Sequence, residues 1–233
     1  MSTGIIVSYD GTPNDEDALA YGKLLQRTGA TIALAYVRHS REFDPAREAV
    51  AQDDAERRLA QGAEWLGQPE IATHIVVAAS TGQGLRDLAV AEKAHVIVFG
   101  SDYRTSPGRV EPGTTARFLI ESGKFAVAIA PAGLRARHDG RFGTLAVIDD
   151  GDPAARQTAE SLATALGTTI SPTATSGDVG LIVVGSSPGA ADGHVLLSGV
   201  TRGVLENARA AVFIIPRNRP LDFARSPSEF TPG

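Results

Sequence analysis

The sequence contains no cysteine, which excludes disulfides, thiolate metal sites and cysteine nucleophiles. It also lacks an apolar run of about 20 residues, the length of a membrane span, and its first residues, MSTGIIVSYDG, lack the basic and apolar regions of a signal peptide. No Lys/Arg-rich block is present, and the net charge of −5 disfavours non-specific binding to nucleic acid. We therefore expect a soluble cytoplasmic protein that binds neither membrane nor nucleic acid.

Several catalytic motifs are missing as well. There is no G-x-S-x-G nucleophile elbow, no Walker loop, and no Rossmann glycine triplet after the first apolar run. The histidines have none of the spacings typical of metal ligands, and they are His39, His74, His95, His138 and His194. We therefore predict that the chain has no catalytic residues, holds no metal and is not an enzyme.

The sequence does contain short apolar runs that alternate with segments of helical spacing. The apolar runs, predicted to be strands, cover residues 4–9, 31–37, 71–78, 94–99 and 125–130. The intervening helices are predicted to begin near Pro13, Pro45, Gly82 and Thr114. Five strands that alternate with four helices predict an α/β fold with a five-stranded parallel sheet and right-handed crossovers.

The pattern then restarts after a linker at about residues 132–143. Asp150-Gly151 matches Asp10-Gly11 at an offset of 140, whereas Gly185 matches Gly100 at an offset of only 85. The second copy has therefore lost about 55 residues (140 − 85), which include the second helix, third strand and third helix. We predict domains at 1–134 and 140–217, packed as an internal pseudo-dimer, and a tail at 218–233 that is disordered or draped on the surface. The whole chain could also form a homodimer.

The stretch from Val96 to Ala116 is the strongest functional signal. A buried strand ends at Gly100, a loop rich in glycine and proline follows, and a helix begins at Thr114. A helix start of this kind offers backbone N–H groups and a favourable dipole to an anion. We interpret the loop as a site for nucleotide phosphates, to which Arg104 and Arg109 would add positive charge.

This arrangement resembles the universal stress protein family, whose ATP-binding members carry G-x2-G-x9-G-[ST] after the fourth strand. Gly100 and Gly113-Thr114 keep that spacing, but Tyr103 replaces the middle glycine. The family's adenine-contacting aspartate matches Asp10, and its backbone contact at the end of strand two matches Val37. The resemblance implies the following nucleotide-binding residues: Asp10, Val37, Gly100, Ser101, Gly113, Thr114 and Thr115.

The second copy departs further from the family's motif. Gly185 and Gly189 are three residues apart instead of two, and Val200 stands after Gly199 where Ser or Thr is expected. A nucleotide is therefore expected only in the first copy, and Thr201 is expected to have a structural role. Because Tyr103 restricts the loop, we expect weak ATP binding, with ADP and AMP as alternative ligands.

Two functions remain open at this point. In the first, the chain is a stress-response regulator that binds an adenine nucleotide, with ATP favoured, and acts on an unidentified protein partner. In the second, both nucleotide sites are lost and the chain is an interaction module of the same fold. The residues also have simpler interpretations that require no nucleotide. Asp10 would be a strand-ending turn residue, Thr114 an ordinary helix cap, and the charged run at 53–58 a solvated helix face.

Overall fold

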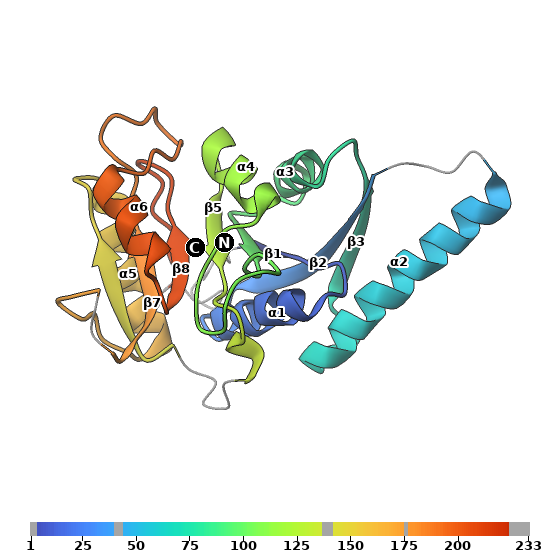
Figure 1. Ribbon diagram of the computed structural model, residues 1–233, viewed down its shortest axis with the longest axis horizontal. Helices are drawn as coiled ribbons and strands as arrows, with labels where there is room; N and C mark the ends of the chain where they lie inside the picture. Colours follow the sequence, from blue (N-terminus) through green and yellow to red (C-terminus); the bar gives the residue numbers. More distant parts are fainter. Residues whose placement is uncertain (1–3, 40–43, 137–141, 175–176, 224–233) are drawn as a thin grey trace, which may run out of the picture.

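A computed structural model describes residues 4–39, 44–136, 142–174 and 177–223 (Figure 1). These residues form one eight-stranded sheet in the order β3-β2-β1-β4-β5-β8-β7-β6. Within the described ranges, no helix is both long enough and apolar enough to cross a membrane.

The first repeat is a five-stranded parallel sheet with the strand order 3-2-1-4-5, so the predicted α/β fold class is confirmed. Its elements begin and end within a few residues of the predicted positions. They are β1 (Gly4–Ser8), α1 (Pro13–Gln26), β2 (Thr31–Arg38), α2 (Pro45–Leu66), β3 (Ala72–Val77), α3 (Thr81–Ala91), β4 (Val96–Phe99), α4 (Thr114–Ser122) and β5 (Ala126–Ile129).

The second repeat keeps only the first, fourth and fifth strands of that plan. After a short 3-10 helix at Leu134–Ala136, it consists of β6 (Thr144–Ile148), α5 (Pro153–Leu166), β7 (Val179–Val184), α6 (Gly199–Glu206) and β8 (Ala211–Ile214). The place of the lost second strand beside β6 is taken by a single bridge between Leu145 and Ile170. This bridge gives part of the edge of β6 a hydrogen-bonding partner.

The two repeats are joined through their last strands. β5 and β8 pair antiparallel, with Ala128 opposite Phe213, and both strands are fully buried. Tyr21 of α1 adds a second connection, because its hydroxyl donates to the carbonyl oxygen of Val212 over 3.3 Å and its ring packs edge-on against Phe142 at 5.1 Å. The repeats therefore share one continuous sheet and a common core.

The helices form a layer on each face of the sheet. α1, α2 and α5 pack into one hydrophobic cluster, and α3, α4 and α6 pack into the other. Figure 1 shows α6 and α4 on either side of β8 and β5, where the two repeats meet. The same view shows α2 beyond β3, at the far end of the sheet.

Residues 218–223 of the tail lie against α5 and are not disordered. The backbone N–H groups of Asn218, Leu221 and Phe223 donate to side-chain oxygens at the start of α5 and on its surface, over 2.6–3.0 Å. The Phe223 ring is buried and lies 6.1 Å from the ring of Phe213. Three prolines and the lack of periodicity hid this docking from the sequence, because the segment is held by bonds to another element. Residues 224–233 lie outside the described part of the chain.

Candidate functional site

The candidate site lies where the strand order reverses, between β1 and β4. β1 pairs with β2 on one side and with β4 on the other, so the connections leave in opposite directions at this point. In open α/β sheets, ligands bind at such a switch point, outside the carboxyl ends of the strands. Asp10 follows the end of β1 and Gly100 directly follows β4, so both lie at this edge.

A cavity of about 230 Å³ opens at the ends of β1 and β2. Asp10 and Val37 both line it, so the structure brings these two predicted residues together. Its walls also include Tyr36, Arg58 and Thr81, none of which the sequence analysis identified. The volume is below the range of about 300–1,000 Å³ that holds most drug-sized ligands. The cavity is therefore suited to one moiety of a nucleotide, such as its base, and not to the whole molecule.

Arg58 is the main residue that the sequence analysis missed. Its Nη1 donates to the carbonyl oxygen of Asp10 over 2.7 Å, and its Nε donates to Asp54 over 2.7 Å. Its guanidinium also lies 5.9 Å from the centre of the Tyr36 ring. The prediction that residues 53–58 form only a solvated face is therefore wrong for Arg58. The spacing along the helix could have indicated this contact, because Arg58 lies one turn after Ala55, whose side chain faces the core.

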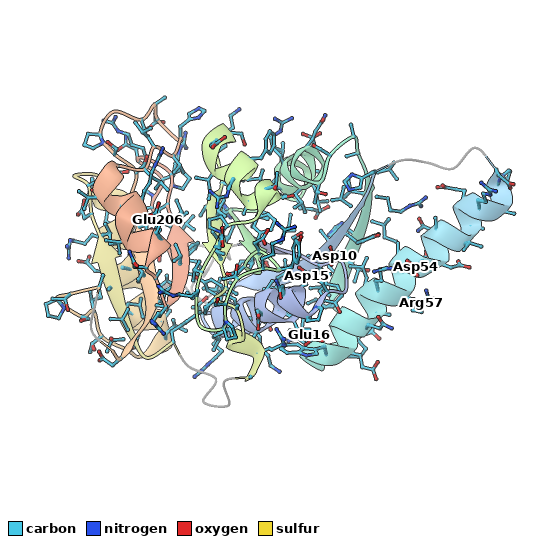
Figure 2. All side chains as sticks on the ribbon, viewed as in Figure 1. Asp10, Asp15, Glu16, Asp54, Arg57 and Glu206 are labelled. Carbon is cyan, nitrogen blue, oxygen red and sulfur yellow. The ribbon has the colours of Figure 1, made fainter. Side chains whose placement is uncertain are left out.

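Asp10 is held by the start of α1. Its carboxylate accepts from the N–H of Thr12 over 3.0 Å, and its own N–H donates to Oδ2 of Asp15 over 2.7 Å. Thr12 is the N-cap residue of α1, but its side chain makes no capping bond, and the Asp15 carboxyl group reaches back to the N–H of Asp10. Figure 2 shows the two aspartates close together at the beginning of α1.

The two carboxyl groups have opposite pKa shifts. Burial of Asp15, reinforced by its contact with Asp10, raises the pKa of Asp15 to about 8. Hydrogen bonds from Asp15 and from Thr12 lower the pKa of Asp10. At neutral pH the proton therefore resides on Asp15, and Asp10 keeps its negative charge at the edge of the cavity. An ionised Asp10 accepts hydrogen bonds only, which suits an amine or a hydroxyl group of a ligand.

This arrangement predicts a pH-dependent stability. Because the pKa of Asp15 is raised, the folded protein keeps a proton between about pH 4 and pH 8 that the unfolded chain releases. The free energy of unfolding should therefore decrease as the pH rises through this window, by up to about 1.4 kcal/mol per pH unit. Asp15→Asn imitates the protonated acid and should flatten the curve. Chemical denaturation at several pH values measures this effect. Asp87→Asn, at an exposed position of α3, should keep the wild-type slope, and parallel curves for wild type and Asp15→Asn would show that Asp15 is ionised throughout.

Gly100 lies at the switch point, but a close contact within the protein already requires a residue without a side chain at this position. A Cβ atom at this position would lie 2.1 Å from the carbonyl oxygen of Asn14 in α1. The Asn14 side chain in turn donates to the carbonyl oxygen of Ser101 over 2.9 Å. The close approach of α1 to the end of β4 therefore explains this glycine without a phosphate.

Ser101 also has a structural role. It is buried, and its hydroxyl donates to the carbonyl oxygen of Ala130 over 2.6 Å and accepts from the N–H of Glu111 over 3.2 Å. These bonds fasten the loop to the end of β5. Ser101 is not among the residues that line the Asp10 cavity, and its hydroxyl is engaged within the protein.

Arg104 and Arg109, the arginines of the loop, do not lie at the Asp10 cavity, where they were expected to meet the nucleotide phosphates. Arg109 donates to the carbonyl oxygen of Asn207 in the second repeat over 3.2 Å, and the Arg104 guanidinium lies 4.9 Å from the centre of the Tyr103 ring. Both arginines line a larger cavity between the two repeats and are not among the lining residues of the Asp10 cavity. Tyr103 itself is 71% exposed. The hypothesis that Arg104 and Arg109 add charge at the nucleotide phosphates is therefore not supported by their positions.

The start of α4 retains the features of an anion site. Gly113 is the N-cap residue, has an ordinary φ of −68° and provides no side chain to bond the first N–H groups of the helix. Thr114 is exposed and Thr115 is partly exposed. The unpaired N–H groups of a helix start attract anions. Gly113, Thr114 and Thr115 thus form a part of the site that is separate from the Asp10 cavity, whose lining residues do not include them.

The second repeat closes the equivalent site with its own side chains. The N-cap of α6 is Ser198, whose Oγ accepts from the N–H of Thr201 over 3.1 Å. Thr201 is fully buried, and its hydroxyl donates to Asp150, the equivalent of Asp10, over 2.7 Å. The structural equivalent of Gly113 is thus Ser198, one residue before the Gly199 that sequence spacing indicated. Thr201 has the structural role that the sequence predicted.

Comparisons with known proteins identify a family and similar solved structures. The sequence model of the universal stress protein family matches residues 1–131. A universal stress protein from Archaeoglobus fulgidus is 14% identical with a TM-score of 0.69, covering 94% of this chain and 100% of its own length. A protein of unknown function from Pseudomonas aeruginosa PAO1 is 15% identical with a TM-score of 0.60, covering 93% of each chain. No curated protein sequence matches the chain. Both solved structures show that the fold extends over nearly the whole chain.

Proposed function

Because the chain belongs to the universal stress protein family, we propose that its first repeat binds an adenine nucleotide, with ATP as the favoured ligand. In this proposal the nucleotide controls how the protein interacts with a partner in a stress response. The second repeat binds no nucleotide and supports the first through the shared sheet.

The difference between the two repeats is the observation that carries this proposal. In the second repeat, Thr201 bonds Asp150 and Ser198 caps α6, so the carboxylate and the helix N–H group are both satisfied within the protein. In the first repeat, Asp10 opens onto a cavity and Gly113 leaves the start of α4 without a side-chain cap. A ligand with a polar base at one end and an anionic group at the other provides the partners that these two places lack.

The residues of the first repeat have distinct roles in this proposal. Asp10 accepts from the amine or hydroxyl of the adenosine, and the backbone of Val37 contacts the base. The N–H groups of Thr114 and Thr115 bind phosphate oxygens, and Gly113 allows the phosphate to approach. Gly100 and Ser101 act indirectly by fixing α1 and the loop. In this proposal the site binds the nucleotide without chemistry. The described residues also contain no group of three or more acidic or histidine side chains that could hold a metal ion.

Calorimetric titration of the purified protein with ATP, ADP and AMP tests this proposal. We expect one site per chain. Asp10→Asn should weaken all three nucleotides about 10- to 100-fold, because it removes a charged acceptor that contributes on the order of 1.5–3 kcal/mol. The matched variant in the second repeat, Asp150→Asn, should leave all three affinities unchanged.

The alternative is an interaction module of the same fold that binds no nucleotide. Its supporting observation is that Gly100 and Ser101 are engaged within the protein. Absence of heat with all three nucleotides would favour this alternative. Both functions assume that the second repeat binds no nucleotide. Two equivalent sites per chain, or equal losses of affinity in Asp10→Asn and Asp150→Asn, would contradict that assumption.

A further inference from the structure

A groove of about 810 Å³ lies between the two repeats, on the face of the sheet that carries α4 and α6. Its walls come from the loop at residues 104–112 and from α4 in the first repeat, and from residues 195–206 in the second. Figure 1 shows the two helices on either side of β5 and β8, and Figure 2 labels Glu206 on α6. The groove shares no lining residue with the Asp10 cavity.

The groove is lined by equivalent residues of the two repeats. Lining residues on its two sides correspond at a constant offset of 85 positions (195 − 110), the same offset that relates α4 to α6 through their N-caps. The equivalent pairs are Val110 and Val195, Arg117 and Arg202, Ile120 and Leu205, and Glu121 and Glu206. The groove therefore has an approximate twofold symmetry in both its apolar and its charged groups.

The inner surface of the groove is apolar. Val110, Ile120 and Val195 are each less than 10% exposed, so their side chains belong to the cluster between the helices and the sheet. Leu196 remains 44% exposed beside them. Apolar surface that is left accessible in a concave site favours an apolar ligand group.

Charged side chains of both signs surround this apolar surface. The lining residues include four arginines and three glutamates: Arg104, Arg109, Arg117, Arg202, Glu111, Glu121 and Glu206. Arg117 donates from Nε to the carbonyl oxygen of Pro112 over 2.8 Å. Its Nη2 has only a weak ion pair, 3.6 Å from Glu111, and both side chains are more than half exposed. For Arg202, no hydrogen bond or ion pair joins its guanidinium to another residue in the described ranges. These two symmetry-related arginines can therefore bind an anionic group from outside the protein.

Thr105 gives an independent indication of a missing partner. It lines the groove, and its hydroxyl oxygen is buried without a hydrogen-bond partner among the described residues. A buried hydroxyl without a partner is unfavourable, because it has lost its hydrogen bonds to water. A polar atom of a bound molecule would satisfy it.

We propose that this groove binds a small amphipathic anion, whose apolar body packs on the accessible lining residues Leu196, Leu197 and Leu205 and whose carboxylate or phosphate binds Arg117 or Arg202. The accessible apolar surface and the exposed guanidinium groups together favour a ligand that combines an apolar body with an acidic head group. The approximate symmetry allows the head group to bind at either arginine. This site is separate from the nucleotide site, so it does not depend on the proposed function.

Calorimetry with dodecanoate and dodecyl phosphate below their micelle concentrations, and with neutral dodecanol below its solubility limit, tests the proposal on the full chain. We expect one molecule of either anion per chain, and at least 10-fold weaker binding of dodecanol. Comparison of the two anions identifies which head group is preferred. Arg117→Gln and Arg202→Gln should each weaken the anions about 3-fold, because the other arginine remains, and the double variant should weaken them at least 10-fold. Arg86→Gln, on α3 outside the groove, is the matched control and should have no effect.

Three results would overturn the proposal. The first is dissociation constants above about 1 mM for both anions. The second is dodecanol binding as tightly as the anions, which would leave the arginines without a role. The third is unchanged binding in the double variant while its circular dichroism spectrum remains that of the wild type. Asp10→Asn should not affect these titrations, and a loss there would place the probe in the Asp10 cavity instead.

Discussion

Replacement of Gly100 by alanine is expected to destabilise the protein by about 3 kcal/mol, an effect at the upper end of the usual range for overpacking. The added Cβ would lie 2.1 Å from the carbonyl oxygen of Asn14, so the backbone of α1 must move. A backbone shift at the start of α1 would also disturb Asp10, which bonds Asp15 of the same helix. Denaturation in urea measures the loss of stability.

Gly113 provides the matched control for this substitution. The nearest atom to a Cβ at position 113 is Oδ2 of Asp102 at 4.0 Å, and its φ is accessible to any residue. Gly113→Ala should therefore change the free energy of unfolding by less than about 1 kcal/mol. If the two alanine variants are equally stable, the contact between α1 and β4 is not the reason for glycine at position 100, and a ligand role regains support.

Removal of the Asp17 carboxylate is expected to have a comparable or larger effect. Asp17 is fully buried in α1, where it accepts from the N–H groups of Gly133 and Arg135 over 2.8 Å and from the Arg135 guanidinium over 2.9 Å. Asp17→Ala leaves these donors without their acceptor, and breaking a buried pair in this way costs about 3–5 kcal/mol.

Glu16 offers a direct comparison, because it contacts the same arginine at the surface. Its carboxylate lies 3.3 Å from Nε of Arg135, and both side chains are at least one-third exposed. Glu16→Ala should cost less than about 1 kcal/mol. Thermal or urea unfolding of both variants measures the difference. Equal stabilities would show that the beginning of the linker between the repeats does not depend on Asp17.

The fold of the first repeat could be predicted because its signals are local. The apolar run at 96–99 ends at a glycine, and Pro45 opens a helix that extends to Leu66 as predicted. The tandem arrangement could be predicted from the matching Asp-Gly pairs. The docking of Phe223 could not, because it depends on bonds to α5 that leave no pattern in the tail itself.

The candidate site could be predicted only in part. Asp10 follows β1 and Val37 lies near the end of the neighbouring strand β2, so strand order alone brings them to one cavity. Arg58 reaches that cavity from a helix 48 residues further along the chain, and the charged residues before it, Glu56 and Arg57, are exposed. For Gly100, the sequence alone could not separate two explanations. A glycine required by another backbone and a glycine required by a phosphate look identical in a sequence, and only the position of Asn14 distinguishes them.

The pairing of β5 with β8 within one polypeptide has a consequence for how this protein can vary. In a homodimer built from identical halves, every substitution occurs twice, so a change that fills one site fills both. Here the two halves are encoded by separate stretches of one gene, so a substitution in one half leaves the other half unchanged. The chain can therefore close one site with Thr201 and Asp150 while the corresponding place beside Asp10 stays open. Association of the halves is also independent of protein concentration, so even a half that has lost three elements remains in place on its neighbour.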